Sequence, residues 1–277
     1  MIDCHTHTCN SPDGSDTPQE AAEQACRLAL KAFAITEHCE ANRLFGREDY
    51  HIDYNSEHVF HNYDIFQKSI SENNIIKEKY SSRLNFINGI ELGQAAHDFK
   101  SAEKIISEKS LDFIICSTHE LPAHEDFAFL DYKKENIHDL LVQYFDETLK
   151  LCKWSRFDVL GHLTYPLRYI MGEAGIDTDI SEFDEIITEC FRTLVKNDKG
   201  IEINTSGLRQ AYGKTFPELK YIKLFRDLGG KIITIGSDSH CTKDIGSGID
   251  KGIELAAAAG FKKIYYFKNH IPYGIQI

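Results

Sequence analysis

Asp3-Cys4-His5-Thr6-His7, at the start of the chain, is the stretch that tells most about both the fold and the chemistry. Ile2–Cys4 is predicted to be a short strand, and two histidines separated by one residue stand at its carboxyl end. In an extended segment, residues i and i+2 point to the same side, so His5 and His7 can bind one ion together. The stretch therefore predicts a metal site where the first strand ends.

The same arrangement recurs along the chain. Thr36-Glu37-His38 stands at the end of the predicted strand Phe33–Thr36, and Ser237-Asp238-Ser239-His240 follows the predicted strand Ile232–Ile235. Three other apolar runs end in the further candidate ligands Glu91, His119 and His162. A lone histidine at a strand end is more often a packed or cleft residue, but one at nearly every strand is hard to explain by packing. Imidazoles and carboxylates, with too few protein ligands to close the coordination shell, indicate a catalytic metal site and so a metal-dependent hydrolase.

Strands and helices alternate over most of the sequence. Thr17 is the expected N-cap of a first helix, with Pro18 at its first position and Glu20 completing a capping box. Further strands are expected at Asn85–Leu92, Asp112–Ser117, Val159–Thr164, Ile201–Asn204 and Lys263–Lys268, and further helices at Lys100–Glu108, Asn136–Lys153, Ser181–Val195, Pro217–Asp227 and Ile249–Ala259. Strand then helix, repeated seven or eight times, predicts an α/β fold in which a parallel sheet closes into a TIM-like barrel. The metal centre is then expected at the carboxyl ends of the strands.

One stretch, residues 40–82, departs from this alternation. It is polar, carries several aromatic residues, and contains three histidines that are expected at the surface rather than as ligands: His51, His58 and His61. An insertion after a barrel strand at the catalytic face would form a lid or a wall of the substrate site. We otherwise expect a single domain over residues 1–277.

Composition excludes several classes of function. The 277 residues are 42% hydrophobic and carry a net charge of −12, which disfavours nucleic acid or an anionic membrane as the main partner. There is no run of 18 apolar residues and no basic, apolar leader, so a cytoplasmic protein is expected. The eight cysteines include no C-x-x-C pair and are expected to be reduced thiols.

Taken in order, the motifs D-x-H-x-H, T-E-H, G-I-E, S-x-H, G-H and S-D-S-H resemble those of the PHP (polymerase and histidinol phosphatase) superfamily. The phrases Gly161-His162-Leu163-Thr164-Tyr165-Pro166 and Ile201-Glu202-Ile203-Asn204-Thr205-Ser206-Gly207 are similar to its histidinol-phosphate phosphatase branch. The resemblance extends over nearly the whole chain. It implies a distorted (β/α)7 barrel with a centre of three divalent ions, for which the ligand types suit zinc, manganese or iron.

The resemblance also implies a role for each matching residue. One ion would be held by His5, His7, Glu91 and Asp238, a second by Glu91, His119 and His162, and a third by His38, His240 and Asp13. Glu91 would bridge the first two ions, and Glu91 and Asp238 would be the catalytic residues. Arg168 and Arg209, which follow predicted strands, would bind the substrate.

These residues suit a phosphomonoester. Three divalent ions carry six positive charges against three carboxylates, and the excess matches a phosphate dianion together with a metal-bridging hydroxide that attacks phosphorus. The expected reaction is hydrolysis of L-histidinol phosphate to L-histidinol and phosphate, a step of histidine biosynthesis. Two alternatives stay open: another PHP phosphoesterase, such as a protein-tyrosine phosphatase or a small-nucleotide phosphodiesterase, and a non-hydrolytic metal-binding module. A P-loop is excluded, because Gly207 and Gly213 are separated by five residues where that motif needs four.

Overall fold

The computed structural model describes residues 1–43, 63–122 and 124–277. Seven parallel strands form one sheet in chain order: β1 Ile2–Asp3, β2 Ala32–Glu40, β3 Asn85–Gly93, β4 Phe113–Ser117, β5 Val159–Leu160, β6 Gly200–Asn204 and β7 Ile233–Gly236. The Cys4 N–H donates to the Ile235 carbonyl (2.9 Å), and Thr6 and Ser239 form a parallel bridge beyond the strand ends. The first and last strands therefore meet, and the predicted (β/α)7 barrel is confirmed.

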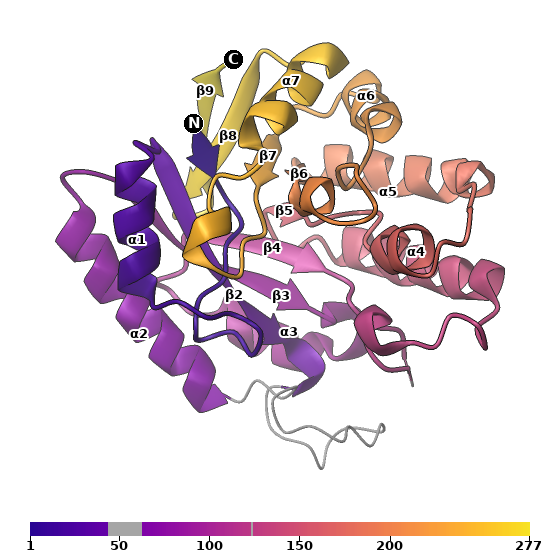
Figure 1. The fold of residues 1–277 in the computed structure, drawn as a ribbon, viewed down its shortest axis with the longest axis horizontal. Coiled ribbons are helices and arrows are strands. Elements are labelled where there is room, and N and C mark those ends of the chain that lie inside the picture. Colours follow the sequence, from indigo (N-terminus) through magenta and orange to yellow (C-terminus); the bar gives the residue numbers. More distant parts are fainter. Residues whose placement is uncertain (44–62, 123) are drawn as a thin grey trace.

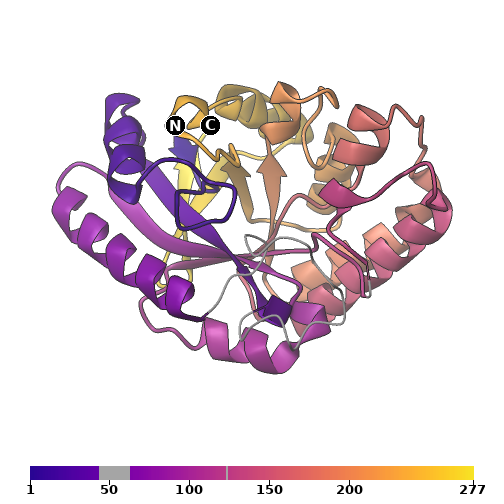
Figure 2. The same ribbon diagram turned by 60° about the horizontal axis from the view of Figure 1, so that its bottom comes forward.

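Helices surround this sheet on the outside, as Figures 1 and 2 show. The α-helices are α1 Pro18–Arg27, α2 Tyr63–Tyr80, α3 Phe99–Ile106, α4 Ile137–Trp154, α5 Asp184–Lys196, α6 Leu219–Asp227 and α7 Ile249–Ala259. Short helical turns complete the connections: η1 Ala41–Arg43, η4 Ala95–His97, η5 Phe127–Phe129, η6 Arg168–Glu173, η7 Ser181–Phe183, η8 Ser206–Arg209 and η9 Thr242–Asp244. Among the described residues, every helix is too short or too polar to span a membrane bilayer.

Helix α1 begins as the sequence predicts. The Thr17 side chain accepts a hydrogen bond from the Glu20 N–H, and the Glu20 carboxylate accepts one from the Thr17 N–H at 2.8 Å. A cap of this kind stabilises a helix start by about 1 kcal/mol. The alanines of the helix, Ala21, Ala22 and Ala25, are buried against the outside of the sheet.

The strands are buried on both faces, because helices cover the outside and side chains fill the inside. Ile87, Ile115, Ile203 and Ile233, from four different strands, are completely buried in one hydrophobic cluster. Burying each such side chain stabilises the fold by roughly 1.5–3 kcal/mol. The barrel wall is therefore a rigid frame for the polar groups at its carboxyl end.

Two strands end four residues away from the predicted position. Strand β2 continues to Glu40, so Thr36-Glu37-His38 lies inside the strand rather than after it. The strand continues because it pairs with β3 over nine residues, and His38 and Glu40 face the barrel rather than solvent. Strand β5 ends at Leu160 instead of Thr164, because the chain turns at His162, whose carbonyl accepts the Tyr165 N–H.

Helix α2 corrects the interpretation of residues 40–82. Residues 63–80 form the barrel helix between β2 and β3, and Phe66, Ile70 and Ile76 are buried in it. That half of the stretch is therefore part of the barrel wall and cannot be a lid. His51, His58 and His61 lie outside the described residues.

Strand β8 Lys263–Lys268 forms as predicted, but it belongs to a second sheet. It pairs antiparallel with β9 Ile271–Gln276, the tail for which the sequence predicts no structure. Asn269 and His270 form the turn with positive φ angles of 48° and 61°. The His270 N–H donates to the Asp112 carbonyl (2.8 Å), just before β4, so the hairpin is fixed to the amino ends of the barrel strands.

Candidate metal centre

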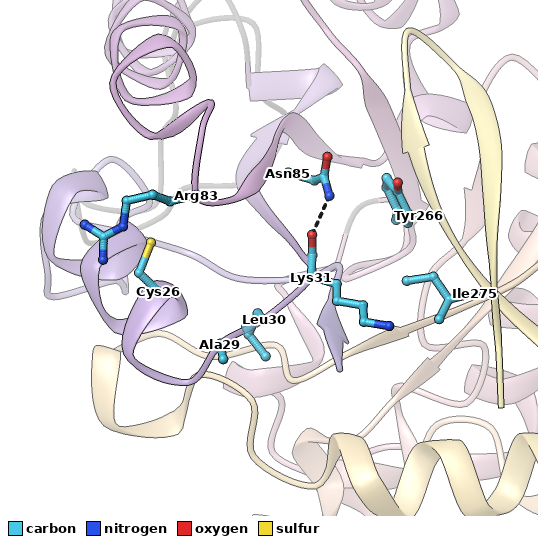
Figure 3. A pocket seen from close by; sticks show the side chains of 8 residues that line it. All are labelled: Cys26, Ala29, Leu30, Lys31, Arg83, Asn85, Tyr266 and Ile275. Atoms are coloured by element: carbon cyan, nitrogen blue, oxygen red, sulfur yellow. Dashed lines mark hydrogen bonds between the residues drawn. The ribbon is translucent and has the colours of Figure 1, made fainter.

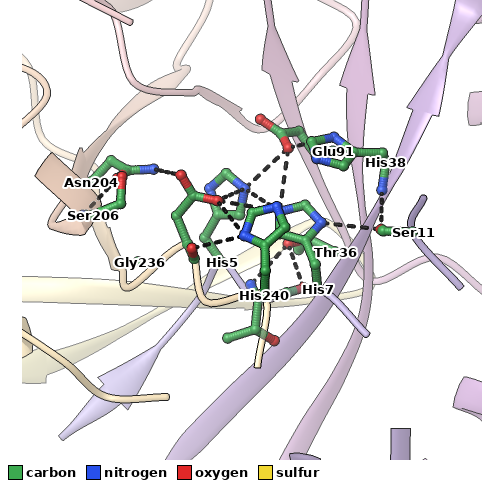
Figure 4. Close-up of polar contacts among 12 residues, drawn as sticks. His5, His7, Ser11, Thr36, His38, Glu91, Asn204, Ser206, Gly236 and His240 are labelled. Carbon is green, nitrogen blue, oxygen red and sulfur yellow. Dashed lines mark hydrogen bonds and ion pairs between the residues drawn. The ribbon is translucent and has the colours of Figure 1, made fainter. Parts of the chain in front are cut away.

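The nine candidate ligands come together at the carboxyl end of the barrel. His5 and His7 follow β1, His38 and Glu91 lie near the ends of β2 and β3, His119 and His162 follow β4 and β5, and Asp238 and His240 follow β7. Asp13 is in the loop between β1 and α1. Figure 4 shows the imidazoles of His5, His7 and His38 facing Glu91, with His240 beside His7. Parallel strands bring their carboxyl ends to one side of a barrel, which is why residues so distant in sequence meet.

A first group consists of His5, His7 and Asp238, all buried. The two Nε2 atoms are 3.1 Å apart, and Asp238 Oδ1 lies 3.7 Å from His5 Nε2 and 3.4 Å from His7 Nε2. These three ligand atoms thus converge on a space of the size of one ion, as the i, i+2 spacing predicts.

A second group consists of Glu91, His119 and His162, also buried. Glu91 Oε1 lies 3.0 Å from His119 Nε2 and 2.7 Å from His162 Nε2, and those two nitrogens are 3.3 Å apart. The Ser117 hydroxyl donates to the same oxygen at 2.8 Å.

The two oxygens of Glu91 face different groups. While Oε1 faces the second group, Oε2 lies 3.2 Å from His5 Nε2, 3.4 Å from His7 Nε2 and 3.0 Å from His38 Nδ1. His38 is close because it is the register partner of Glu91 in the β2–β3 pair. Burial alone would raise the pKa of the Glu91 carboxyl, but the charges of His5, His119 and His38 hold it well below its usual range.

The third group lies nearer the solvent. The rings of His38 and His240 each stack on His7, with side-chain exposures of 16% and 28%. Asp13 Oδ2 lies 3.1 Å from His240 Nε2, and its Oδ1 lies 3.7 Å from His38 Nε2. Because the Asp13 side chain is 57% exposed, this group opens to the mouth of the barrel.

Burial and nearby charges lower the pKa of one imidazole of the site and raise that of another. Burial, together with the neighbouring His38 and His240, lowers the pKa of His7 to about 3, so its ring is neutral and can act as a ligand. Burial alone would also lower the pKa of His119, but Glu91 and Glu40 raise it to about 10. A cation therefore stabilises this part of the site, and an ion can replace the proton that His119 otherwise binds.

The donor set fits divalent metal ions. In the part of the chain that the structure describes, Glu91 Oε2 and His38 Nδ1 are buried and make no hydrogen bond, although they face each other. Such groups are costly to bury unless a ligand satisfies them. Imidazoles and carboxylates suit zinc, and also manganese or iron. The clusters are thus able to hold metal ions.

Sequence reasoning missed several residues that surround the candidate ligands. Glu40 Oε1 lies 3.0 Å from His119 Nδ1, and with His38 it forms a fourth group of possible ligands. Ser11 Oγ lies 3.2 Å from His7 Nδ1 and donates to Glu37 at 2.6 Å. One feature of the sequence could have indicated them, namely a carboxylate within a strand that is otherwise apolar. Glu37 and Glu40 of β2 and Glu202 of β6 are such residues, and all three are buried.

Arg168 lies beside the first group. It begins η6, a π-helix, and its Nη2 donates to Asp238 Oδ2 (3.0 Å) and to the Ser206 hydroxyl (2.6 Å). Its guanidinium lies over the rings of Tyr165 and Phe216 at 5.1 and 5.5 Å, which fixes its plane. Within the described residues its buried Nε–H has no acceptor.

Arg209 ends η8 on the same side of the site. Its two terminal nitrogens donate to the carbonyls of Ser237 (2.8 Å) and Asp238 (3.2 Å). It therefore supports the loop that carries Asp238 and adds a second positive charge there.

A pocket at the other end of the barrel contains none of these residues (Figure 3). It has a volume of about 520 Å³ and lies among the end of α1, the starts of β2 and β3, and the hairpin, with Leu30, Lys31, Asn85, Tyr266 and Ile275 in its lining. The nine candidate ligands thus lie at the opposite, carboxyl end of the barrel from this pocket.

Comparison with known proteins gives consistent matches. The family model described as PHP domain matches residues 3–206. The probable histidinol-phosphatase of Thermotoga maritima is 27% identical over 253 residues, which cover 91% of this chain and 89% of that protein. The histidinol-phosphatase of Lactococcus lactis is 28% identical over 277 residues, covering 97% of this chain and 94% of that protein.

A solved structure has the same fold. It is the crystal structure of histidinol phosphate phosphatase from L. lactis, complexed with zinc, L-histidinol and phosphate. Its TM-score to this chain is 0.79, at 24% sequence identity and with 98% of both chains covered. The arrangement of strands and helices is therefore shared over the full length.

Proposed function

The chain belongs to the PHP domain family, and from this premise we propose that it is a metal-dependent phosphatase of L-histidinol phosphate. The observation that carries the proposal is the position of Glu91, whose two oxygens face two separate groups of buried imidazoles. A carboxylate in this position can bridge two ions, which is the arrangement of centres that hydrolyse phosphate esters. The family relatives named histidinol-phosphatase support the substrate.

We assign the ligands as the sequence predicts. His5, His7, Glu91 and Asp238 would hold a first ion, Glu91, His119 and His162 a second, and His38, His240 and Asp13 a third. When bound, divalent ions lower the pKa of water toward ~7 and neutralise charge on the phosphate. We propose zinc as the ion, with support from the zinc in the L. lactis structure.

The residues of the chain bind and orient the phosphate. Arg168 is held by aromatic rings and by Asp238, so its positive charge is fixed beside the first group. Asp238 joins this arginine to the first group, because its Oδ2 accepts from Arg168 while its Oδ1 faces His5 and His7. The phosphate is thus expected between the arginines and the first two groups.

The leaving group is expected on the side of His119. Glu40 and Glu120 are buried there, and the Tyr165 ring packs edge-on against His119, with centroids 5.1 Å apart. Acceptors and an aromatic face suit the amine of histidinol, which carries a positive charge near neutral pH, and the imidazole, which donates an N–H. A broad basic rim for a phosphotyrosine peptide would be unexpected on a chain with a net charge of −12.

A phosphate-release assay on several substrates tests the proposal. Purified zinc-loaded protein is incubated with L-histidinol phosphate, phosphotyrosine, p-nitrophenyl phosphate and nucleotides, each with and without a chelator. We expect histidinol phosphate to be the best substrate and the chelator to abolish release. A preference for a phosphodiester would contradict the substrate, and unchanged release after complete metal removal would contradict the mechanism.

Two further proposals concern the binding partner of the protein and its location in the cell. A small-molecule substrate, rather than nucleic acid or a membrane, remains the expected partner, and a cytoplasmic location remains a prediction. All eight cysteines are free thiols in the structure.

A further inference from the structure

Glu202 is a buried carboxylate of β6 that is not among the candidate ligands. Its side chain is 1% exposed. One oxygen, Oε1, lies 2.7 Å from His5 Nδ1, and the other, Oε2, accepts the main-chain N–H of His162 at 3.0 Å. The same side chain therefore contacts a residue of the first group and a residue of the second.

The surrounding chain makes room for this contact. A Cβ atom at Gly236, on the neighbouring strand β7, would lie 2.3 Å from His5 Cβ and 2.4 Å from Glu202 Oε1. Any larger residue there would separate Glu202 from His5. Figure 4 shows Gly236 beside His5 and Asn204, and Asn204 Nδ2 lies 3.4 Å from Glu202 Oε2 and donates to Asp238 Oδ2 at 3.2 Å.

The contact determines which nitrogen of His5 carries a proton. A carboxylate only accepts hydrogen bonds, so Nδ1 of His5 must be the donor. In the neutral ring, Nε2 is then left with its lone pair, and it faces His7 Nε2 (3.1 Å), Glu91 (3.2 Å) and Asp238 (3.7 Å). This is the tautomer that a ligand of the first group needs.

We propose that Glu202 is a positioning residue that holds one ligand from each of the first two groups. It fixes the ring and tautomer of His5 through Oε1, and the main chain that carries His162 through Oε2. The inference rests on the proposed metal centre, and it adds a residue from β6, the one barrel strand that supplies no candidate ligand.

The substitution Glu202→Gln tests the hydrogen bonds of Glu202 without changing how its side chain packs. Glutamine has almost the same shape but only one acceptor oxygen. The His162 N–H is a fixed donor and takes that oxygen, so the amide NH₂ faces His5 Nδ1. His5 must then carry its proton on Nε2, where the ion would bind.

The experiment compares zinc affinity by chelator competition in wild type, Glu202→Gln and the control Glu147→Gln. Glu147 is a buried glutamate of α4 that contacts Lys150 and His97 and none of the nine candidate ligands. We expect the zinc affinity of Glu202→Gln to fall by ~10- to 100-fold, and that of Glu147→Gln to match wild type.

A spectroscopic measurement supplies the second readout. Histidine ¹⁵N NMR of zinc-loaded wild type, with His5 assigned by a His5→Asn variant, should show Nδ1 protonated and Nε2 bound to metal. Because it uses the wild type, this readout holds even if Glu202→Gln fails to fold.

The outcomes separate this inference from the proposed function. Wild-type zinc affinity in a folded Glu202→Gln, or a His5 that binds zinc through Nδ1, would overturn the role of Glu202 and leave the metal centre intact. A wild-type protein that binds no metal would contradict the centre and the inference together.

Discussion

Glu91 is the single side chain on which most of the proposed centre depends. It is completely buried, and five imidazole nitrogens lie within 3.4 Å of its oxygens. Glu91→Ala should therefore lose bound metal and nearly all phosphatase turnover, because both of the first two groups lose their shared ligand. Elemental analysis of the purified variant measures the metal content directly.

Asp13→Ala is the matched comparison for that variant. Among the described residues, Asp13 contacts His38 and His240 of the third, solvent-facing group, so its loss should remove at most one ion and leave the other two. A Glu91→Ala protein that retained the metal content of wild type would exclude Glu91 as a bridge.

The two arginines allow a prediction about substrate binding. Replacing Arg168 or Arg209 by alanine should remove a charge-assisted hydrogen bond to phosphate, at a cost of about 1.5–3 kcal/mol, or roughly 10- to 150-fold in kcat/KM. Metal content should be unchanged. Arg156 is a surface arginine that pairs with Glu103, and the Arg156→Ala variant serves as the control. If both variants keep wild-type kcat/KM on histidinol phosphate, the arginines do not bind the substrate.

Eight of the nine candidate ligands could be predicted from the sequence because they stand at or near the end of an apolar run, where a barrel places its functional groups. Asp13, in the loop before α1, was predicted only from the family resemblance. The contacts around the ligands could not be predicted. Glu202 and His5 are 197 positions apart, and Glu40 faces His119 only because β2 extends beyond its apolar part. Such contacts depend on closure of the barrel and on strand register, which local patterns do not define.

Elements with a clear local signal were predicted well, and those without one were not. Helix α1 has a complete capping box, and α7 is bounded by Gly260 in the left-handed conformation. Helix α2 was missed because its apolar residues do not form a clear stripe along one face, although Phe66, Ile70 and Tyr80 are buried along it. The β8–β9 hairpin was only half predicted, since Pro272 and Gly274 weaken the strand pattern of the tail.

The turn of that hairpin gives a pH prediction. His270 Nδ1 lies 2.8 Å from Asp158 Oδ2, and this hydrogen bond raises the pKa of His270, with Asp112 adding to the effect and Lys199 opposing it. A raised pKa in the folded state means that the contact stabilises the protein at pH values below the usual His value of ~6.5. That stabilisation is lost as the pH rises through the folded-state pKa.

Thermal melts of wild type and His270→Gln at about pH 6 and about pH 9, both with chelator, measure this dependence. We expect the variant to be less stable at the lower pH, with a small difference because the His270 side chain is 41% exposed. The difference should shrink at the higher pH. A larger difference at about pH 9 would contradict the ion pair.

Closure of the barrel connects metal binding to the stability of the fold. The ligands come from six strands and their loops, so an ion that binds them stabilises the folded state over the unfolded chain. At a free zinc concentration about 100-fold above Kd, the gain is about 2.7 kcal/mol, and for a chain of this size the Tm should rise by roughly 5–10 °C. Calorimetry with zinc and with chelator measures the shift. A Tm that does not respond to zinc in wild type would contradict a centre built from these strands.

The most direct measurement is kcat/KM of the zinc-loaded protein on L-histidinol phosphate, compared with phosphotyrosine and p-nitrophenyl phosphate. The same ions act on all three esters, and the two aryl esters have the better leaving groups. A preference for histidinol phosphate must therefore come from groups that contact its leaving group. We predict that histidinol phosphate exceeds both others by at least ~100-fold, about 2.7 kcal/mol in transition-state binding. Equal values for all three substrates would contradict a histidinol-phosphate phosphatase and leave only a metal-dependent phosphatase of the PHP family.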